Sequence, residues 1–192
     1  MKSINITNHY NFLGEIADIM SGVFVKPSLG GEISYLQVRD LTMSPQITPS
    51  TRVDYSPRFR DLILRKGDLL FVGKGSRYLC QVFELNITAV PSTAFFIIRP
   101  NRSRVLPEYL CWYLNQPKVI AAVKTVQAGG GTPMIHKPTL EQLEIIVPDL
   151  ETQRFVVEVS RLQRREGQLL KSLAEKRVQL TNQLLYNEII NK

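Results

Sequence analysis

Hydrophobic and polar positions follow two patterns along the chain, and the change falls near Pro148. Before this residue, short apolar and β-branched runs alternate with Gly, Pro and Asp, which is typical of short strands separated by turns. After it there is no further proline, and Gly167 is the only glycine. Such a segment favours one uninterrupted helix. We therefore predict two regions, residues 1–150 and residues 151–192.

The first region is predicted to be a globular mixed domain of the α+β class. Two short helices are expected at residues 107–116 and 117–127, because each begins with proline at the first helical position. The second of these helices should stop at the alanine and three glycines of residues 128–131. Strands are expected at residues 33–38, 68–72, 78–85, 93–98 and 143–147.

The second region is predicted to be a single coiled-coil helix over residues 151–188. Its apolar residues are spaced 4, 3, 7, 4, 7 and 4 apart, a seven-residue repeat. Glu166 and Lys176 occupy two positions of this repeat, where polar residues commonly fix register or orientation. The apolar members are Phe155, Val159, Leu162, Leu169, Leu173, Leu180 and Leu184.

The length of this helix predicts a partner helix. At about 1.5 Å per residue it would be about 57 Å long, which exceeds the width of a domain of about 150 residues. It therefore cannot pack along its whole length on its own domain. A helix that folds back over that domain is the alternative.

Composition and charge fit a cytoplasmic protein with a polyanionic partner. The chain has 192 residues, 44% of them apolar, and a net charge of +7. We find neither a run of about 18 apolar residues nor a signal-peptide pattern at the N-terminus. Cys80 and Cys111 lie in apolar stretches, so two buried thiols are expected, with one disulfide as the alternative. Basic residues outnumber acidic ones over residues 52–77, although a solvated loop face would have the same composition.

The sequence indicates no catalytic centre and no metal site. His9 and His136 are far apart, and the chain lacks a Cys-x-x-Cys pair and a Gly-x-Ser-x-Gly motif. Asp61, Asp68 and Lys74 are the best approximation to a nuclease set. However, Asp68 follows Gly67 at a tight turn into a strand, where an aspartate is expected to be structural. We therefore expect a binding protein that is not an enzyme.

Three segments carry the cations and polar groups that duplex DNA recognition requires. The first, residues 74–78, lies between two predicted strands. The second, residues 129–137, begins with three glycines and could equally be a flexible connector. The third is residues 52–60, and the sequence does not show whether the three share a surface. The candidate DNA-binding residues are Arg52, Arg58, Arg60, Lys74, Ser76, Arg77, Tyr78, Thr132, His136 and Lys137.

The order of four stretches resembles the specificity (S) subunit of type I restriction-modification enzymes. Residues 13–22 are similar to the opening of a target recognition domain, and residues 64–72 to a basic-Gly-Asp-apolar strand. Residues 106–114 resemble the helix that follows a strand ending in Arg-Pro. Residues 131–153 resemble the join between recognition domain and spacer helix, where the family's Pro-Pro-Leu-x-x-Gln is Pro-Asp-Leu-Glu-Thr-Gln here.

This resemblance implies a division of labour between subunits. The S subunit recognises DNA, modification subunits methylate adenine with S-adenosylmethionine, and a restriction subunit cleaves. No cofactor is expected on this chain itself. A full S subunit has two recognition domains, each followed by a helix, whereas this sequence has one of each, so it resembles a half subunit.

We therefore expect a homodimer in which the predicted helix pairs antiparallel with its copy about a twofold axis. Such a dimer would recognise a bipartite, palindromic site with half-sites at most about 17 base pairs apart. Two alternatives remain. One is a non-specific scaffold or decoy for modification subunits, and the other is a small nuclease.

Overall fold

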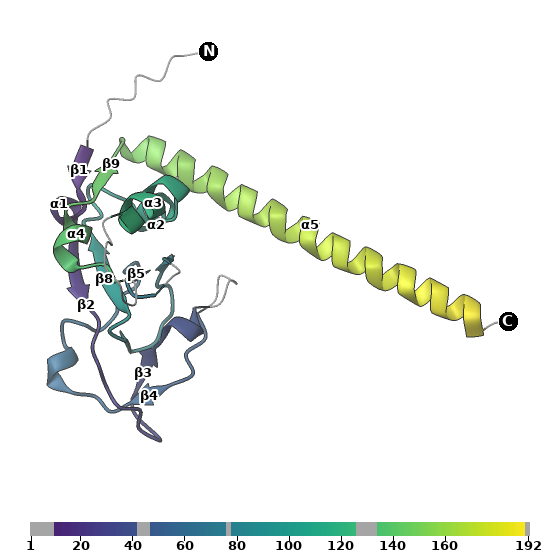
Figure 1. Cartoon of the computed structure of the whole chain (residues 1–192), viewed down its shortest axis with the longest axis horizontal. Coiled ribbons are helices and arrows are strands. Elements are labelled where there is room, and N and C mark those ends of the chain that lie inside the picture. The colour runs from purple at the N-terminus through teal and green to yellow at the C-terminus, as the bar shows by residue number, and fades with distance from the viewer. Residues whose placement is uncertain (1–9, 42–46, 76–77, 126–133, 191–192) are drawn as a thin grey trace, which may run out of the picture. The chain divides into compact units, whose positions relative to one another are not determined.

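The computed structural model describes residues 10–41, 47–75, 78–125 and 134–190 (Figure 1). Its contacts divide the chain into two compact units, Met1–Arg154 and Phe155–Lys192. The C-terminal helix begins at Leu150. Its first turn therefore packs as part of the first unit.

The first unit contains strands and helices, as the sequence predicted. Its strands are β1 (Tyr10–Phe12), β2 (Ala17–Ser21), β3 (Ile33–Leu36), β4 (Arg52–Val53), β5 (Leu69–Val72), β6 (Cys80–Val82), β7 (Ala89–Pro91), β8 (Phe95–Pro100) and β9 (Glu144–Ile146). Its α-helices are α1 (Leu13–Ile16), α2 (Pro107–Leu114), α3 (Pro117–Thr125) and α4 (Lys137–Glu141). Its described residues also include two short 3-10 helices, Val38–Asp40 and Pro57–Phe59.

Three sheets organise these strands (Figure 1). The largest has the order β2-β8-β5-β6 with antiparallel neighbours, and β8 pairs with both β2 and β5. The second has the order β4-β3-β7 and includes a parallel pair, β3 with β7. The third joins β1 to β9, so the first described strand lies beside the strand that precedes the long helix. The α+β prediction is confirmed.

Several elements differ from the sequence prediction. All five predicted strands are present; β8 is shifted by two residues and the other four are shorter than predicted, while β1, β2, β4 and β7 were not predicted. The expected strand 33–38 ends at Leu36, because Val38–Asp40 turns into a 3-10 helix. Asp40 stabilises that turn by accepting hydrogen bonds from the Gln37 and Ser50 backbone N–H groups, at 2.8 and 3.2 Å. The strands that were not predicted have two to five residues, too few for a two-residue alternation to stand out in a sequence.

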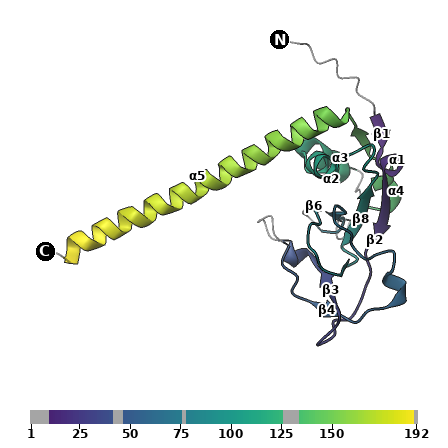
Figure 2. The ribbon, with the colours of Figure 1, turned by 180° about the vertical axis from the view of Figure 1, so that it is seen from behind.

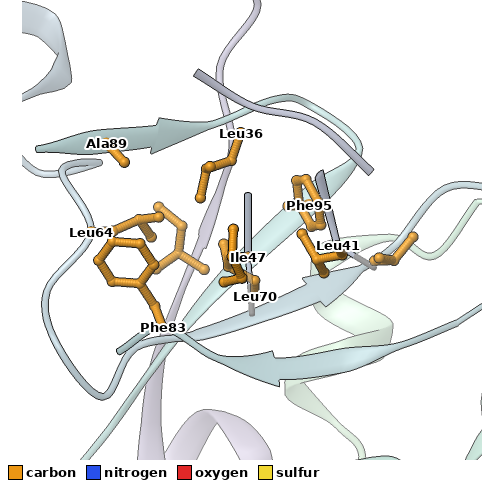
Figure 3. Close-up of a cluster of buried hydrophobic side chains, with 10 residues drawn as sticks. Leu36, Leu41, Ile47, Leu64, Leu70, Phe83, Ala89 and Phe95 are labelled. Atoms are coloured by element: carbon orange, nitrogen blue, oxygen red, sulfur yellow. The ribbon is translucent and has the colours of Figure 1, made fainter. Parts of the chain in front are cut away.

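A cluster of buried aliphatic and aromatic side chains packs between the two larger sheets (Figure 3). Leu36 of β3, Leu70 of β5, and Phe95 of β8 belong to it, and each is at most 1% exposed. Cys80 and Cys111 are not joined by a disulfide; Cys80 is buried and Cys111 is half-buried, and the Cys111 thiol donates a hydrogen bond to the Cys80 carbonyl at 3.3 Å. Burial raises the pKa of the Cys80 thiol well above its usual value. The structure thus has two thiols at these positions and not the alternative disulfide.

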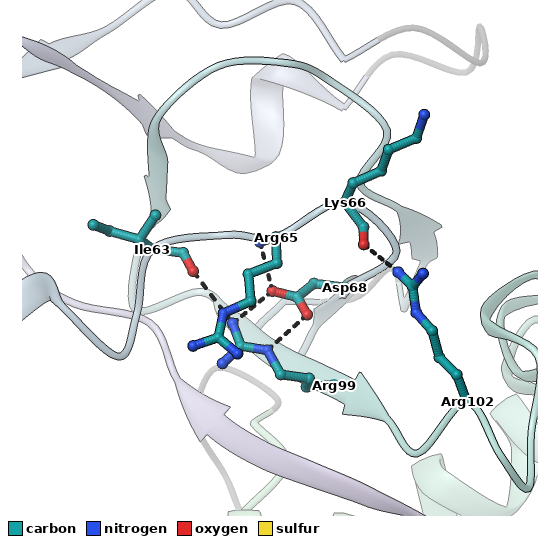
Figure 4. Close-up of polar contacts among 6 residues, drawn as sticks. All are labelled: Ile63, Arg65, Lys66, Asp68, Arg99 and Arg102. Carbon is teal, nitrogen blue, oxygen red and sulfur yellow. Dashed lines mark hydrogen bonds and ion pairs between the residues drawn. The ribbon is translucent and has the colours of Figure 1, made fainter.

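A buried ion pair holds the turn before β5 (Figure 4). Asp68 accepts hydrogen bonds from Nε and Nη2 of Arg99, at 2.9 and 2.7 Å, and from the Arg65 backbone N–H at 2.8 Å. Arg99 Nη2 also donates to the carbonyl of Ile63. The hydrogen bonds that Arg99 donates to Asp68 raise the pKa of Arg99 despite its partial burial. Asp68 is thus structural, as its sequence position suggested.

The second unit continues α5 (Leu150–Ile190), which Figure 2 shows as one unbroken helix. The predicted helix is confirmed, with ends that lie one and two residues beyond the predicted ones. All seven apolar members of its repeat are exposed, from 38% for Val159 to 68% for Phe155. Within the described ranges, no helix has the length and apolar character needed to cross a membrane.

Candidate nucleic-acid interface

Two of the three candidate segments meet in the structure. Lys74, after the end of β5, forms an isolated antiparallel bridge with Met134. Beside it, the Ile135 backbone N–H donates a hydrogen bond to the carbonyl of Gly73 at 2.9 Å. The segments are separated by about sixty residues in the sequence. The hydrogen-bonded bridge therefore supplies the shared surface that sequence alone did not show.

Two glycines shape the backbone on either side of Lys74. A Cβ atom on Gly73 would lie 2.5 Å from Cε2 of Phe96, so only glycine lets β5 end so close to this ring. Gly75 has a φ of +104°, in a region that side-chain-bearing residues rarely adopt. Lys74 lies between these constraints with an exposed side chain. The backbone thus presents the lysine at a defined point.

After the bridge, the chain continues through a buried isoleucine and then presents exposed polar side chains. Ile135 is 3% exposed, whereas Met134 is 41% exposed. His136 and Lys137, at the start of α4, are exposed. Lys137 also forms an ion pair with Glu141 at 3.4 Å. We call Lys74, Met134, His136 and Lys137 the bridge surface. It combines two ammonium groups, an imidazole and an exposed thioether.

The other predicted DNA-binding residues have varied surroundings. Ser76, Arg77 and Thr132 lie outside the described residues. Tyr78 is only 5% exposed and its ring stacks on Phe71, with centroids 6.3 Å apart. Tyr78 therefore belongs to the core, and we remove it from the candidate DNA-contacting set. Its sequence position, next to two basic or polar residues after a glycine, gave no sign of this burial.

The third candidate segment, residues 52–60, begins in β4, which belongs to the sheet β4-β3-β7. Arg52 of β4 donates to the carbonyls of Gly31 and Glu32, both at 3.0 Å, and so stabilises a neighbouring loop. Arg58 lies over the ring of Phe59, with 5.2 Å from Cζ to the ring centroid. Arg58 and Arg60 are both exposed. These two arginines stay candidates for phosphate contacts, while the donors of Arg52 are largely engaged within the chain.

A further basic cluster was not among the predicted site residues. Arg65, Lys66 and Arg102 are exposed around the turn that Asp68 holds (Figure 4). Arg102 donates to the carbonyl of Lys66, and Lys66 lies 3.7 Å from Glu84. The available signal was the repetition of arginine in residues 99–104, just before α2.

An apolar groove of the first unit is a poor match for a phosphate backbone. A groove of about 750 Å³ lies between α3, α4 and β9, and its lining is mostly aliphatic. Lys118 and Glu144 are its charged lining residues. Phosphate contacts need several cations, so the bridge surface is the better candidate. Within the described residues, no three His, Cys, Asp or Glu side chains gather as they would to hold a metal ion.

Comparison with known proteins decides the family. The sequence pattern of the type I restriction modification DNA specificity domain matches residues 8–189. The chain belongs to this family. Residues of the chain are also 33% identical, over 102 positions, to the type I restriction enzyme HindI specificity subunit of Haemophilus influenzae. That alignment covers 50% of this chain and 22% of the HindI subunit.

Solved structures share the fold of this specificity domain. A chain from a structure on the assembly of a type I R-M system has a TM-score of 0.69 at 22% identity, over 94% of this chain and 44% of that one. The HsdS subunit from Thermoanaerobacter tengcongensis has a TM-score of 0.65 at 21% identity, over 88% and 40%. The S subunit from M. genitalium has a TM-score of 0.59 at 16% identity, over 91% and 44%. The chain thus spans less than half the length of each of these relatives.

Proposed function

We propose that this chain is a sequence-specific DNA-binding specificity subunit whose bridge surface contacts double-stranded DNA. The observation that carries the proposal is the bridge between Lys74 and Met134. It brings two separately predicted binding segments to one place, on a domain whose family is named for DNA specificity. No reaction is assigned to the chain itself.

The chemistry of the bridge surface suits both parts of DNA recognition. The ammonium groups of Lys74 and Lys137 can neutralise phosphates, which position a protein on the duplex without reading its sequence. The imidazole of His136 and the thioether of Met134 can meet base edges in a groove through polar and apolar contacts. We expect the exposed Arg58 and Arg60 to add phosphate contacts.

The long helix supports the second part of the proposal, a homodimer. The exposed apolar repeat of α5 needs a covering surface, and an antiparallel copy would provide one with twofold symmetry. Two recognition domains related by that symmetry would bind a bipartite, palindromic site. The dimer would direct S-adenosylmethionine-dependent modification subunits, and a restriction subunit with them, to this site.

Replacing Lys74 with alanine tests the DNA contact. We would measure binding of the full chain to a random-sequence duplex by fluorescence anisotropy across a salt series. Each phosphate contact contributes about −0.9 to the slope of log affinity against log salt, so Lys74→Ala should make the slope shallower by about 0.9. Lys118→Ala, an exposed lysine on α3, is the matched control and should leave the slope unchanged.

The wild-type slope distinguishes the main alternative. A slope near zero would favour a scaffold or decoy that binds modification subunits without DNA. Selection from a library of random duplexes would then identify the target of a DNA-binding chain. Enrichment of two inverted half-sites supports the dimer, whereas a single, non-palindromic block would contradict it.

A further inference from the structure

The exposed apolar face of α5 is interrupted by two residues of opposite charge. In its seven-residue repeat, the positions that a partner helix would cover alternate between d and a from Phe155 to Leu180. Glu166 takes an a position and Lys176 a d position. Their apolar neighbours Leu169 and Leu173 are 53% and 54% exposed. The face thus presents one negative and one positive charge within an otherwise apolar strip.

We propose that α5 pairs with α5 of a second copy in the one antiparallel register that places Glu166 opposite Lys176 of the partner subunit. This inference rests on the homodimer of the proposed function and adds its register. In an antiparallel pair of identical helices, facing residues have numbers that add up to a constant, here 342. By symmetry the ion pair forms twice, and the twofold axis passes beside Lys171.

The same register matches the four leucines nearest the twofold axis. It places Leu169 opposite Leu173 of the partner subunit, and Leu162 opposite Leu180 of the partner subunit. Each facing pair joins an a position to a d position, which is the layer arrangement of an antiparallel coiled coil. The central four leucines of each helix therefore all meet leucine, and both charges meet an opposite charge.

Leu170 gives a further check, because it is an apolar residue outside the a and d positions and its side chain is 59% exposed. It occupies the e position, and e positions face each other in an antiparallel pair. In this register the numbers of the two e positions add up to 340, two less than for directly facing core residues, so the two copies of Leu170 lie next to each other across the twofold axis. The next e position pairs Gln163 with Arg177 of the partner subunit, so the flanking positions add no like-charge contact there.

Other arrangements leave the charges unpaired. A shift of one heptad in either direction places Lys176 against Val159 or Leu173 of the partner subunit. Burying a charge against an apolar side chain without a partner is costly. A parallel pair in register would place glutamate on glutamate and lysine on lysine. Charge complementarity therefore selects a single arrangement.

The register also sets a distance that matters for DNA. With the twofold axis at Lys171, the two copies of Leu150 lie about 63 Å apart along the coil, at about 1.5 Å per residue. That distance corresponds to about 18 base pairs at about 3.4 Å each, slightly more than the bound of about 17 that the shorter predicted helix gave. A shift of one heptad would change it by about 10 Å, or about three base pairs. The Glu166–Lys176 pair would thereby determine half-site spacing.

Cysteine cross-linking on the full chain tests the register. The E166C/K176C variant should form a covalent dimer with oxidised glutathione, through a disulfide between positions 166 and 176 of the two copies. Within one chain these positions are about 15 Å apart, which exceeds the Cα separation of about 4.4–6.8 Å that a disulfide requires. E166C alone should therefore give no more covalent dimer than the wild-type chain, which controls for Cys80 and Cys111.

Charge reversal gives an independent measurement by analytical ultracentrifugation. E166K and K176E should each weaken the dimer about tenfold or more, because both ion pairs become repulsive contacts. The E166K/K176E double variant restores the pairs and should return to within about threefold of wild type.

The outcomes separate the two proposals. A wild-type dimer in which E166C alone cross-links as well as E166C/K176C would overturn the antiparallel register and keep the homodimer. A dimer that shows neither the cross-link nor the charge-reversal pattern would overturn the register as well. A chain that stays monomeric with and without DNA would overturn both the register and the homodimer, while the Lys74→Ala salt series would still test DNA binding.

Discussion

Replacing Gln153 with alanine should weaken the attachment of the start of α5 to the first unit and lower the free energy of unfolding by a measurable amount. Gln153 is fully buried, with 0% exposure. Its Oε1 accepts a hydrogen bond from the Leu106 backbone N–H at 2.8 Å. Its Nε2 donates to the carbonyls of Arg104 and Pro148, at 3.0 and 2.8 Å. One amide side chain thus joins the first turn of the helix to the segment before α2.

The expected loss of stability is about 3 kcal/mol. Alanine would leave one backbone N–H and two carbonyls without their present partner, and a buried unsatisfied group costs about 1–3 kcal/mol. The Leu106 N–H and the carbonyl of the buried Pro148 should bear most of this cost. The carbonyl of Arg104 belongs to an exposed residue, so water can replace the amide there.

Urea unfolding followed by tryptophan fluorescence measures this effect, because the chain's single tryptophan is Trp112 on α2. With a urea dependence of about 2 kcal/mol per molar, the midpoint should fall by about 1.5 M. Gln168→Ala, at an exposed position of the same helix, should change the midpoint little. If the two variants lost the same stability, or Gln153→Ala lost less than about 0.5 kcal/mol, the anchoring role would be wrong.

Two further predictions concern carboxylates near the ends of elements. Asp68→Ala should lower the free energy of unfolding in urea by about 3–5 kcal/mol, because it leaves Arg99 unpaired in a mostly buried site. Asp61→Ala, at an exposed position, is its control. Equal losses in the two variants would refute the structural role of Asp68. Asp149 caps α5 by accepting hydrogen bonds from the Thr152 N–H and hydroxyl, at 2.9 and 2.8 Å, and these bonds lower its pKa. Its stabilising effect should be present above the ordinary aspartate pKa and disappear as pH falls through the lower folded pKa. Circular dichroism should show this acid-induced loss of helix in the wild type and not in Asp149→Asn, a cap that does not titrate.

The helix and the family were predictable because their signals are local or ordered along the chain. A seven-residue apolar repeat without proline specifies a helix on its own, and α5 follows it within two residues at each end. The turn at Gly67 and Asp68 was likewise recognisable, because glycine followed by aspartate before an apolar run has a local cause. The partner of Asp68, Arg99, lies thirty-one residues away and could not be assigned from sequence.

The candidate site was only half predictable for the same reason. Lys74, His136 and Lys137 could be chosen as exposed polar residues in glycine-rich segments. Their meeting depends on the hydrogen bond between Ile135 and Gly73, a non-local backbone contact with no residue-type signature. Tyr78 shows the opposite error. An amphipathic side chain in a basic loop suits either a DNA contact or a core position, and its stacking on Phe71 decided between them.

The segment between the bridge surface and α5 connects the two halves of the proposed function. Only twelve residues lie between Lys137 and Leu150 on this path. Several of them hold the backbone in place: the Leu143 carbonyl accepts a hydrogen bond from the Leu13 N–H at 2.9 Å, and the Ile146 carbonyl accepts one from the Tyr109 hydroxyl at 2.8 Å. Gln153 then fixes the first turn of the helix. At Asp149, where the sequence departs from the family's second proline, the chain gains a helix cap. A spacing between half-sites that depends on helix register requires such a connection, because a loose linker would make the register irrelevant to the DNA. Destabilising the anchor at Gln153 should therefore broaden the accepted half-site spacing without changing the half-site sequences, whereas charge reversal at Glu166 should weaken the dimer itself.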